Sequence, residues 1–314
     1  MKTIKQLDII PHSQRGHFFI LEHARIEKND DIIVYKQIKN GINLVYNIPY
    51  INTNMLLLGK GCSITTEALL FMSAQGILIG ITGGKGLPLY NEIYNISFIN
   101  PANEYRPVKY NQIFANIFFN ENKRLKVAKK FFMKRIDNAL LYYHKLIDEK
   151  IINFTHNDYL IVKQLFEEYK NKLDNVKNNN EILLVEANYT KEIYKTFATL
   201  YNVKFSRDHH SNDDINQNLT HLNYICYGIG NIVLYTLGIS HSFSVFHGKT
   251  RRGALTFDIA DIIKDAFSIP FAFYGYSENL NDTEIKYKLI EYLYRYNIIK
   301  DTIQFIKNIT EEFK

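Results

Sequence analysis

The sequence predicts a two-domain α+β protein, with a β-sandwich-like N-terminal domain that contains one helix and an all-α C-terminal domain. Short β-branched and aromatic runs fill the first hundred residues, whereas helical periodicity dominates the rest of the chain. A loop bracketed by Pro101 and Pro107 separates the two patterns. The length of 314 residues also exceeds what one hydrophobic core usually serves. We therefore expect domains at residues 1–100 and 101–314.

The first domain is expected to consist of short strands around a single helix. The strands are predicted at Phe18–Ile26, Ile32–Gln37, Asn43–Ile48, Met55–Gly59 and Ile77–Ile81, with turn-forming residues between them. The helix is predicted over Thr65–Gln75, with Ser63 as its N-cap and Gly76 as the glycine that ends it. Strands this short, at roughly ten-residue spacing, are typical of a sandwich or an open barrel.

The second domain is expected to be helical throughout. Asn111–Ile151 is nearly free of Gly and Pro and has amphipathic stretches. Further helical patterns cover Tyr159–Leu173, Thr190–Tyr201, His221–Leu237, Ile259–Phe267 and Asp282–Arg295.

Composition excludes several classes of protein. Apolar residues make up 46 % of the chain and charged residues 22 %, which is ordinary for a globular protein and argues against disorder. No window of about 18 apolar residues indicates a membrane span, and Met1–Pro11 lacks the features of a signal peptide. Two cysteines cannot form a disulfide scaffold, so a reducing cytoplasm is the expected compartment. The net charge of +6 favours a polyanionic partner only mildly.

One segment is strongly basic. Residues 121–150 contain nine Lys and Arg against four Asp and Glu. Their spacing of three and four residues places four lysines on one helical face, which Arg124 and Arg135 flank. The four are Lys123, Lys126, Lys130 and Lys134. The face is either a solvated surface or a site for DNA phosphates.

The most informative stretch for chemistry is His247–Asp265. Asp258 and Asp261 are three residues apart at the predicted start of a helix, so both carboxylates share a face. In an apolar setting such a pair repels unless a cation lies between the carboxylates, and Mg²⁺ and Mn²⁺ prefer oxygen ligands of this kind. The alternative is a structural role, with Asp258 as the N-cap and Asp261 as the third residue of the helix.

Other residues could complete such a site. His247 could lend a neutral ring nitrogen to a metal or could simply pack beside Phe246. Arg251 and Arg252 lie in a glycine-bounded loop and suit phosphate binding, or form an ordinary exposed turn. Glu186 follows three aliphatic residues and is either a carboxylate at a helix N-terminus or a partly buried site residue. The His209–His210 loop and Ser240–Ser242 are weaker candidates for a metal site and a nucleophile.

The chain as a whole resembles the CRISPR-associated protein one family, the endonucleases and integrases of CRISPR adaptation, and in particular its subtype I-F branch. The resemblance rests on Arg15–Arg25 with Leu57–Gly84, on Glu186–Tyr194, and on Gly238–Ala272. The second block contains the family's glutamate with a tyrosine eight residues later. The third contains the family's histidine, its Asp-x-x-Asp pair and a loop with Thr-Arg-Arg.

The resemblance implies that Glu186, His247, Asp258 and Asp261 are catalytic. Glu186, His247 and Asp261 would then bind Mg²⁺ or Mn²⁺, with Asp258 as a ligand or an adjacent acid. The implied reaction inserts new spacer DNA into the CRISPR array by attack of a 3′-hydroxyl on the repeat, as antiviral defence. The DNA backbone contacts are expected at six basic residues, which are Lys123, Arg124, Lys130, Lys134, Arg251 and Arg252.

The resemblance also implies the partners. They are double-stranded DNA, as the protospacer fragment and the leader–repeat, a second copy of the chain bound through the β domain, and the second adaptation protein fused to the helicase–nuclease. Two alternatives remain open. A transposon-type integrase would share the catalytic domain, and a DNA-binding scaffold would have lost catalysis.

Overall fold

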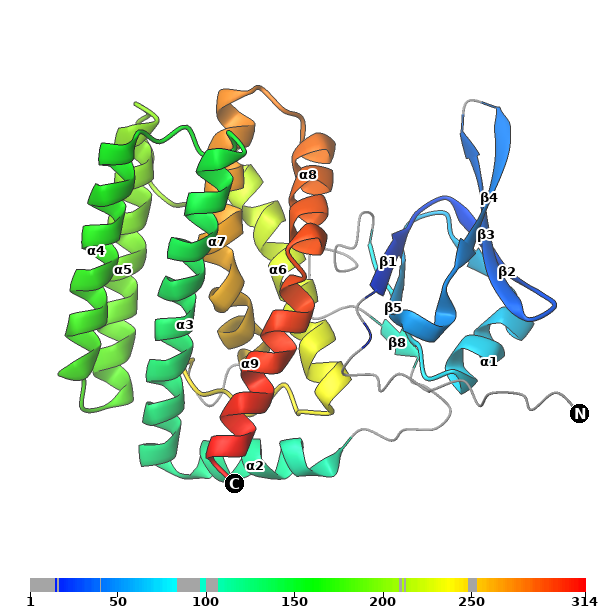
Figure 1. Cartoon of the computed structure of the whole chain (residues 1–314), viewed down its shortest axis with the longest axis horizontal. Coiled ribbons are helices and arrows are strands. Elements are labelled where there is room, and N and C mark those ends of the chain that lie inside the picture. The colour runs from blue at the N-terminus through cyan, green and yellow to red at the C-terminus, as the bar shows by residue number, and fades with distance from the viewer. Residues whose placement is uncertain are drawn as a thin grey trace, which may run out of the picture. The chain divides into compact units, whose positions relative to one another are not determined.

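The structure is a computed structural model that describes residues 15, 17–39, 41–83, 97–99, 107–208, 211, 213–247 and 253–314. The chain divides into two compact units, Met1–Arg106 with Ile299–Ile303, and Pro107–Ile298 with Gln304–Lys314. Strands predominate in the first unit and helices in the second (Figure 1), which confirms the predicted fold class. The predicted boundary between residues 100 and 101 lies outside the described residues.

The described part of the first unit contains two four-stranded sheets. One has the strand order β1-β5-β7-β8 and is parallel except for β8, and the other has the order β4-β3-β2-β6. The first sheet consists of β1 (His17–Leu21), β5 (Thr53–Leu58), β7 (Leu78–Ile81) and β8 (Ser97–Ile99). The second consists of β2 (Ala24–Asn29), β3 (Ile32–Lys39), β4 (Ile42–Ile48) and β6 (Ser63–Ile64).

Both sheets and helix α1 (Thr66–Ala74) contribute to one apolar core. Leu56 and Ile79 enter it from the first sheet, Ile26 and Ile33 from the second, and Met72 from α1. Because the two inner faces meet over a shared core, the arrangement is the predicted sandwich-like one.

Two predictions about this unit were wrong in detail. Phe18–Ile26 is not one strand, because the chain turns at His23, where φ is 48°, and β1 and β2 enter different sheets. Ser63 is not the N-cap of α1, since it pairs with Arg25 in the second sheet. The cap is Thr65, whose hydroxyl accepts a hydrogen bond from the Ala68 amide at 3.3 Å.

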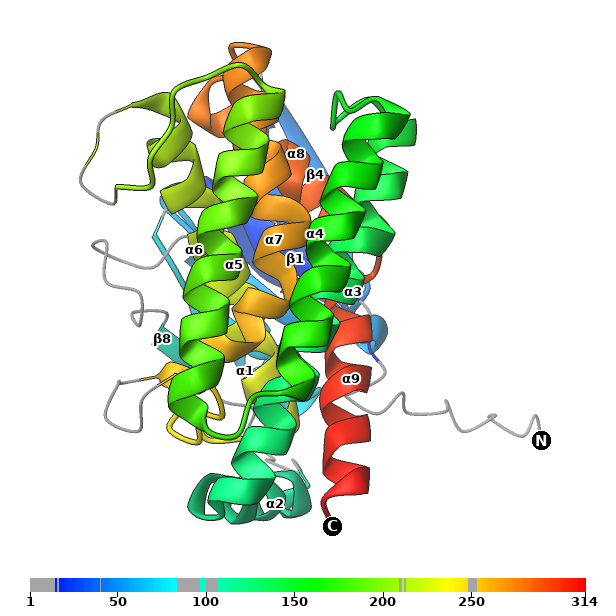
Figure 2. The ribbon, with the colours of Figure 1, turned by 90° about the vertical axis from the view of Figure 1, so that its left-hand side faces the viewer.

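In the second unit, α7 is the central helix (Figure 2), and α6 and α3 make its most extensive contacts. Its side chains are buried over almost the full length, which explains the run of apolar residues on every face. The helices described in this unit are α2 (Val108–Phe119), α3 (Glu121–Asp148), α4 (His156–Asp174), α5 (Asn179–Leu200), α6 (Asp214–Leu237), α7 (Ala254–Ser277), α8 (Asp282–Arg295) and α9 (Ile298–Glu312), except that Ile299–Ile303 of α9 is counted with the first unit.

Several helix predictions need correction, and α6 and α7 extend beyond the predicted His221–Leu237 and Ile259–Phe267. The stretch Asn111–Ile151 contains two helices, because Asn120 has extended backbone angles and its side chain caps α3 by accepting from the Lys123 amide at 3.0 Å. α5 begins at Asn179 rather than Thr190, capped by Asn178. α9 was not predicted. None of the helices among the described residues combines the length and apolar character that crossing a membrane requires.

Candidate active site

Three acidic side chains project from one face of α7. Asp258, Asp261 and Asp265 are three and four residues apart, which places them in one row along the helix. Each of these residues is less than a tenth exposed. The helix begins after Gly253, so neither Asp258 nor Asp261 lies at a capping position, and the interpretation of this pair as a helix cap is wrong. Buried carboxylates require compensating donors, and each of the three has them.

The Asp258 carboxylate organises the loop that carries His247. Its oxygens accept hydrogen bonds from the amides of Val245 (2.7 Å), Phe246 (3.1 Å) and His247 (3.1 Å), and Oδ1 lies 2.6 Å from Nδ1 of the His247 ring. Because a carboxylate only accepts, the ring proton lies on Nδ1 and the lone pair of the neutral ring lies on Nε2. The Ser244 hydroxyl adds a bond of 2.8 Å to the His247 carbonyl. Asp258 therefore orients His247, and its oxygens are already engaged.

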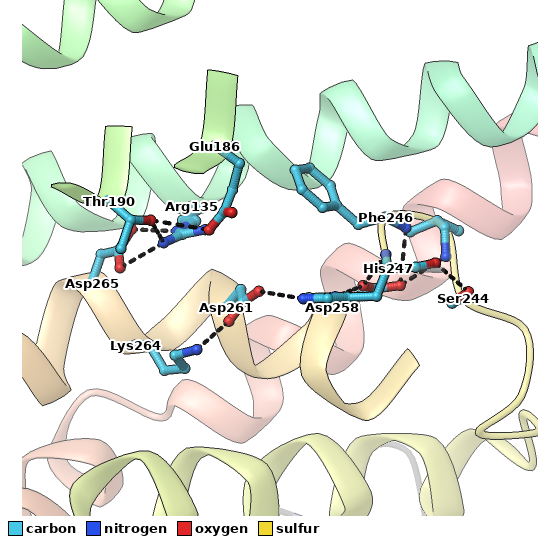
Figure 3. A network of polar contacts seen from close by, with 11 residues as sticks. Arg135, Glu186, Thr190, Ser244, Phe246, His247, Asp258, Asp261, Lys264 and Asp265 are labelled. Atoms are coloured by element: carbon cyan, nitrogen blue, oxygen red, sulfur yellow. Dashed lines mark hydrogen bonds and ion pairs between the residues drawn. The ribbon is translucent and has the colours of Figure 1, made fainter. Parts of the chain in front are cut away.

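Asp261 faces His247 on one side and a lysine on the other (Figure 3). Its Oδ2 lies 3.9 Å from Nε2 of His247, and its Oδ1 lies 2.5 Å from Nζ of Lys264. Burial on its own raises the pKa of the Asp261 carboxyl, but the charges of Lys264 and Arg135, with the nearby His247 ring, outweigh it and lower the pKa to about 2. Asp261 is therefore ionised at neutral pH despite its burial.

Glu186 lies within α5, two turns from its start, and not at a helix N-terminus. Its Oε1 accepts hydrogen bonds from a guanidinium nitrogen of Arg135 at 2.7 Å and from the Thr190 hydroxyl at 3.0 Å. Arg135 also binds both oxygens of Asp265. Burial lowers the pKa of the Arg135 guanidinium, but the carboxylates of Asp265, Glu186 and Asp261 raise it well above its usual value. The structure thus brings Glu186 to the row of acids on α7 through an arginine.

Sequence reasoning missed Arg135, Thr190, Lys264 and Asp265. Arg135 was assigned to the flank of a basic surface, yet it is 4 % exposed and packs among Phe132, Ile136 and Ala139 of α3. A signal was present, because Arg135 falls on the apolar stripe of its helix rather than on the lysine face. Asp265 likewise continues the spacing of Asp258 and Asp261 by one more turn.

The donor set suits a hard divalent cation. Two carboxylates and a neutral imidazole are ligands that Mg²⁺ and Mn²⁺ accept, and a histidine whose other nitrogen donates to a carboxylate is the usual form of a metal-binding histidine. Neighbouring ligands at about 2.1 Å from an octahedral ion lie about 3 Å apart, so the 3.9 Å between Nε2 and Oδ2 must shorten slightly. Among the described residues, no three His, Cys, Asp or Glu side chains are yet close enough to share an ion.

A groove of about 980 Å³ has Glu186 among its lining residues. It runs along α5 and the segment after it, and its lining includes Thr190, Tyr194 and four basic residues. These four are Lys191, Lys195, Lys204 and Arg207. Among the described residues that line the groove, Glu186 alone is acidic. Positive charge beside the candidate site favours a polyanion, and no sequence pattern indicated that these basic residues meet in a groove.

Of the six residues predicted to contact DNA, the four that the structure describes differ in their surroundings. On α3, Lys130 makes an ion pair of 2.8 Å with Glu312, and the Arg124 guanidinium contacts the side-chain amide of Asn179. Lys123 and Lys134 lie on the same helix and are half-buried. Arg251 and Arg252 lie outside the described residues, as does the His209–His210 pair.

Comparison with known proteins identifies relatives over almost the whole chain. Residues 18–280 match the model of the family described as CRISPR associated protein Cas1. A protein of Pectobacterium atrosepticum named CRISPR-associated endonuclease Cas1 is 34 % identical, over 90 % of this chain and 89 % of its own. A protein of Pseudomonas aeruginosa with the same name is 32 % identical, over 98 % and 96 %.

Solved structures show the same fold at low sequence identity. A TtCas1–DNA complex superposes with a TM-score of 0.64 at 15 % identity, over 93 % of this chain and 95 % of that one. A casposase bound to its integration product gives a TM-score of 0.59 at 15 % identity, over 85 % and 74 %. A partial Cas6-RT-Cas1–Cas2 complex gives 0.57 at 15 % identity, over 85 % and 77 %.

Proposed function

This chain belongs to the CRISPR associated protein Cas1 family, and from that premise we propose that it is a metal-dependent DNA endonuclease and integrase that inserts new spacers into a CRISPR array. The observation that carries the proposal is the His247 ring, which Asp258 holds with Nε2 directed at the Asp261 carboxylate. An imidazole fixed in this tautomer beside a second acid is prepared to bind a cation.

In this proposal Glu186, His247 and Asp261 bind Mg²⁺ or Mn²⁺, and Asp258 holds the histidine. Held by these residues, a divalent ion would supply stabilisation of charge on the attacked phosphate and activation of the nucleophile. Lys264 adds a fixed positive charge 2.5 Å from Asp261, which also suits an anionic transition state. Burial of the Asp258 and Asp261 carboxylates shields their hydrogen bonds from water and so maintains their geometry.

The chemistry is displacement at phosphorus. During integration the 3′-hydroxyl of the protospacer fragment attacks a phosphodiester at the leader–repeat junction, a new phosphorus–oxygen bond forms, and the oxygen of the cut strand leaves. When water attacks instead, the product is a nicked strand. Both reactions require the same site and differ only in the nucleophile, so one set of residues serves both activities.

The basic groove that Glu186 lines is the proposed DNA-binding surface closest to the candidate catalytic residues. A double variant, Lys191→Ala with Lys195→Ala, should weaken the binding of every DNA sequence alike. It should also lower the slope of log affinity against log salt concentration by about two. Lys172→Ala is the control, since Lys172 is paired with Glu168 at 2.6 Å on the neighbouring helix α4. An unchanged slope in the groove variant would exclude these lysines from the interface.

The first unit offers a surface for the proposed homodimer. β4 is an edge strand of its sheet, and Ile42 and Val45 on it are 62 % and 57 % exposed, beside Ile38 of β3 at 73 %. An apolar edge of this kind favours pairing with another copy. Light scattering of a Val45→Asp variant tests the dimer, which should dissociate into monomers. An unchanged mass would place the dimer interface on another surface.

A further partner is proposed from the family resemblance. It is the second adaptation protein, fused to the helicase–nuclease.

The direct test of the function is Asp261→Ala assayed on DNA carrying a leader and a repeat. Cleavage and strand transfer should both be abolished while the fold persists, because the carboxylate acts as a ligand, and EDTA should silence the wild-type chain equally. Asp137→Ala is the matched control, as this acid lies on the surface of α3 and pairs with Lys170. Full activity of Asp261→Ala in Mn²⁺ would contradict the proposal.

The same substrates separate the alternatives. A transposon-type integrase would join transposon ends in preference to a protospacer fragment at a repeat. A silent scaffold would bind DNA without cutting it, although all four candidate residues are retained in this chain.

A further inference from the structure

A buried cluster of charged side chains lies on the side of Glu186 that is away from the His247 loop (Figure 3). At its centre Arg135 binds Asp265 with two guanidinium nitrogens, one of these bonds measuring 3.0 Å, and gives a third nitrogen to Glu186 at 2.7 Å. The rings of Tyr189 and Phe132 cover the guanidinium, with centroids 5.2 Å and 5.9 Å from its carbon. Asp265 is 2 % exposed, so the pair is shielded from solvent.

We propose that Asp265 is a positioning residue that balances the charge of Arg135, so that the cluster around Glu186 keeps a net negative charge and Glu186 keeps one oxygen available for a divalent cation. The inference rests on the proposed metal site. Asp265 itself touches neither the cation nor DNA in this account and acts only through Arg135.

The charges explain why a second acid is needed. Arg135 alone would form a neutral pair with Glu186, and its positive charge would oppose a metal ion arriving beside that carboxylate. With Asp265 present, one cation is shared between two carboxylates, so the cluster keeps a net charge of −1. Ion pairs in a buried setting are poorly screened, so removal of one acid changes the potential at the other.

The hydrogen bonds explain how one oxygen stays available. Arg135 and the Thr190 hydroxyl both donate to Oε1 of Glu186, at 2.7 Å and 3.0 Å. Thr190 in turn accepts from Arg135 at 3.1 Å, which closes a small ring of bonds. Within the described part of the chain, Oε2 accepts no hydrogen bond. Glu186 is thus fixed through one oxygen and offers the other.

α3 and α7 hold this arrangement rigid. Asn138, nearly one turn after Arg135, donates to the Ile262 carbonyl at 3.0 Å, and the Tyr143 hydroxyl donates to the Asp265 carbonyl at 2.7 Å. Because these bonds fix α7 against α3 at Ile262 and at Asp265 itself, Asp265 has little freedom to leave Arg135.

The test measures Mn²⁺ affinity by titration calorimetry on the full chain without DNA. Asp265→Asn keeps the shape and removes the charge, and it should bind Mn²⁺ about tenfold more weakly, the lower end of the loss seen when the group that fixes a metal ligand is disturbed. Asp265→Glu keeps the charge and should bind Mn²⁺ clearly more tightly than Asp265→Asn. Asp137→Asn, which changes an acid on the surface of α3, is the control and should leave the affinity unchanged.

A double variant separates charge from structure. Arg135→Gln combined with Asp265→Asn removes both buried charges, restores the net charge of the cluster, and should return Mn²⁺ affinity close to that of wild type. It also avoids leaving the buried guanidinium without the carboxylate of Asp265, so it should fold even where Asp265→Asn does not. Wild-type affinity in Asp265→Asn, or affinity in the double variant at least tenfold weaker than wild type, would overturn the inference. If wild type itself binds no Mn²⁺ in a manner that depends on Asp261, the proposed metal site fails instead.

Discussion

Replacing Asp258 with Asn isolates the contribution of one carboxylate to the state of His247. The amide has nearly the same shape, but one of its two oxygen positions becomes an NH₂ group that cannot accept. Wild-type Asp258 accepts from three backbone amides and from Nδ1 of the ring. Either orientation of the amide therefore leaves at least one donor facing another donor.

The two orientations differ in cost. When the side-chain oxygen of the introduced Asn faces His247, the backbone amides of Val245 and Phe246, both buried, lose their acceptor. When that oxygen faces Val245 and Phe246, only the backbone amide of His247 loses its acceptor, and the side-chain NH₂ faces Nδ1 of the ring. The second orientation is better by roughly one unsatisfied buried donor, or about 1–3 kcal/mol. In that orientation Nδ1 accepts, the ring proton moves to Nε2, and Nε2 no longer presents a lone pair toward Asp261.

The expected result is therefore a change of tautomer together with a loss of metal binding. Nitrogen NMR of histidine-labelled protein should show the proton on Nε2 in Asp258→Asn and on Nδ1 in wild type. Mn²⁺ affinity and strand transfer should both fall by about 10- to 100-fold. The unfolding free energy should fall by about 1–3 kcal/mol for the one abandoned donor.

Ser244→Ala is the matched control for this experiment. It removes one bond from the same loop, to the His247 carbonyl at 2.8 Å, without touching the ring. It should lower stability by about 1 kcal/mol and leave the tautomer unchanged. If Asp258→Asn kept the Nδ1 proton and wild-type Mn²⁺ affinity, then Asp258 would not set the state of His247 and its proposed role would be refuted.

Substitutions elsewhere test the basic face, the helix packing and a surface ion pair. Replacing Lys130 and Lys134 with Ala should lower the salt slope of DNA binding by about one for each phosphate that is no longer bound, and an unchanged slope would leave the α3 face as solvated surface. Gly230→Ala should destabilise the chain by about 1–3 kcal/mol in urea unfolding, because its Cβ would lie 2.6 Å from the Thr256 carbonyl oxygen of the neighbouring helix, and an unchanged midpoint would disprove that tight approach. Burial raises the pKa of Asp282, but hydrogen bonds from His221 and Lys286 lower it well below its usual value. Its contribution, about 1 kcal/mol at 42 % exposure, should be complete above the unfolded pKa of about 3.9 and disappear as pH falls further. The stability deficit of Asp282→Asn should accordingly shrink between pH 5 and pH 2, and a deficit independent of pH would refute this.

The fold was predictable because its signals are local. Alternation of apolar residues in the first unit and the helical period in the second both depend on neighbours a few residues apart. The errors also have a local cause, since the hydrophobic run Phe18–Ile26 conceals a turn at His23 whose positive φ is not marked by a glycine. Asn120 was overlooked in the same way, because an asparagine inside a polar stretch does not interrupt the helical period.

The candidate site was predictable only where one element carries it. Asp258 and Asp261 share a helix, so their spacing alone places them together. Arg135 and Asp265 are 130 residues apart, and only the packing of α3 against α7 brings them into contact. The groove lysines after Glu186 likewise depend on how residues 201–207 fold back beside α5. The sequence left open whether His247 packs beside Phe246 or binds a metal. The hydrogen bond between its ring and Asp258 favours metal binding.

The geometry of the site shows how several acidic side chains can lie close together in an apolar setting. Acidic side chains gathered in an apolar setting repel one another and oppose folding until a cation arrives. Here each acid has a fixed partner of its own, since Asp258 accepts from the His247 loop, Asp261 pairs with Lys264, and Glu186 binds Arg135. Lys264 and Arg135 each occupy only one side of the acid that they bind, whereas both oxygens of Asp258 are engaged. Lys264 holds Oδ1 of Asp261 and Arg135 holds Oε1 of Glu186, while Nε2 of His247 and Oδ2 of Asp261 face each other. Each acid therefore has compensating donors before any ion binds, and the atoms on the other side of Asp261 and Glu186 are of the kind that a divalent cation prefers.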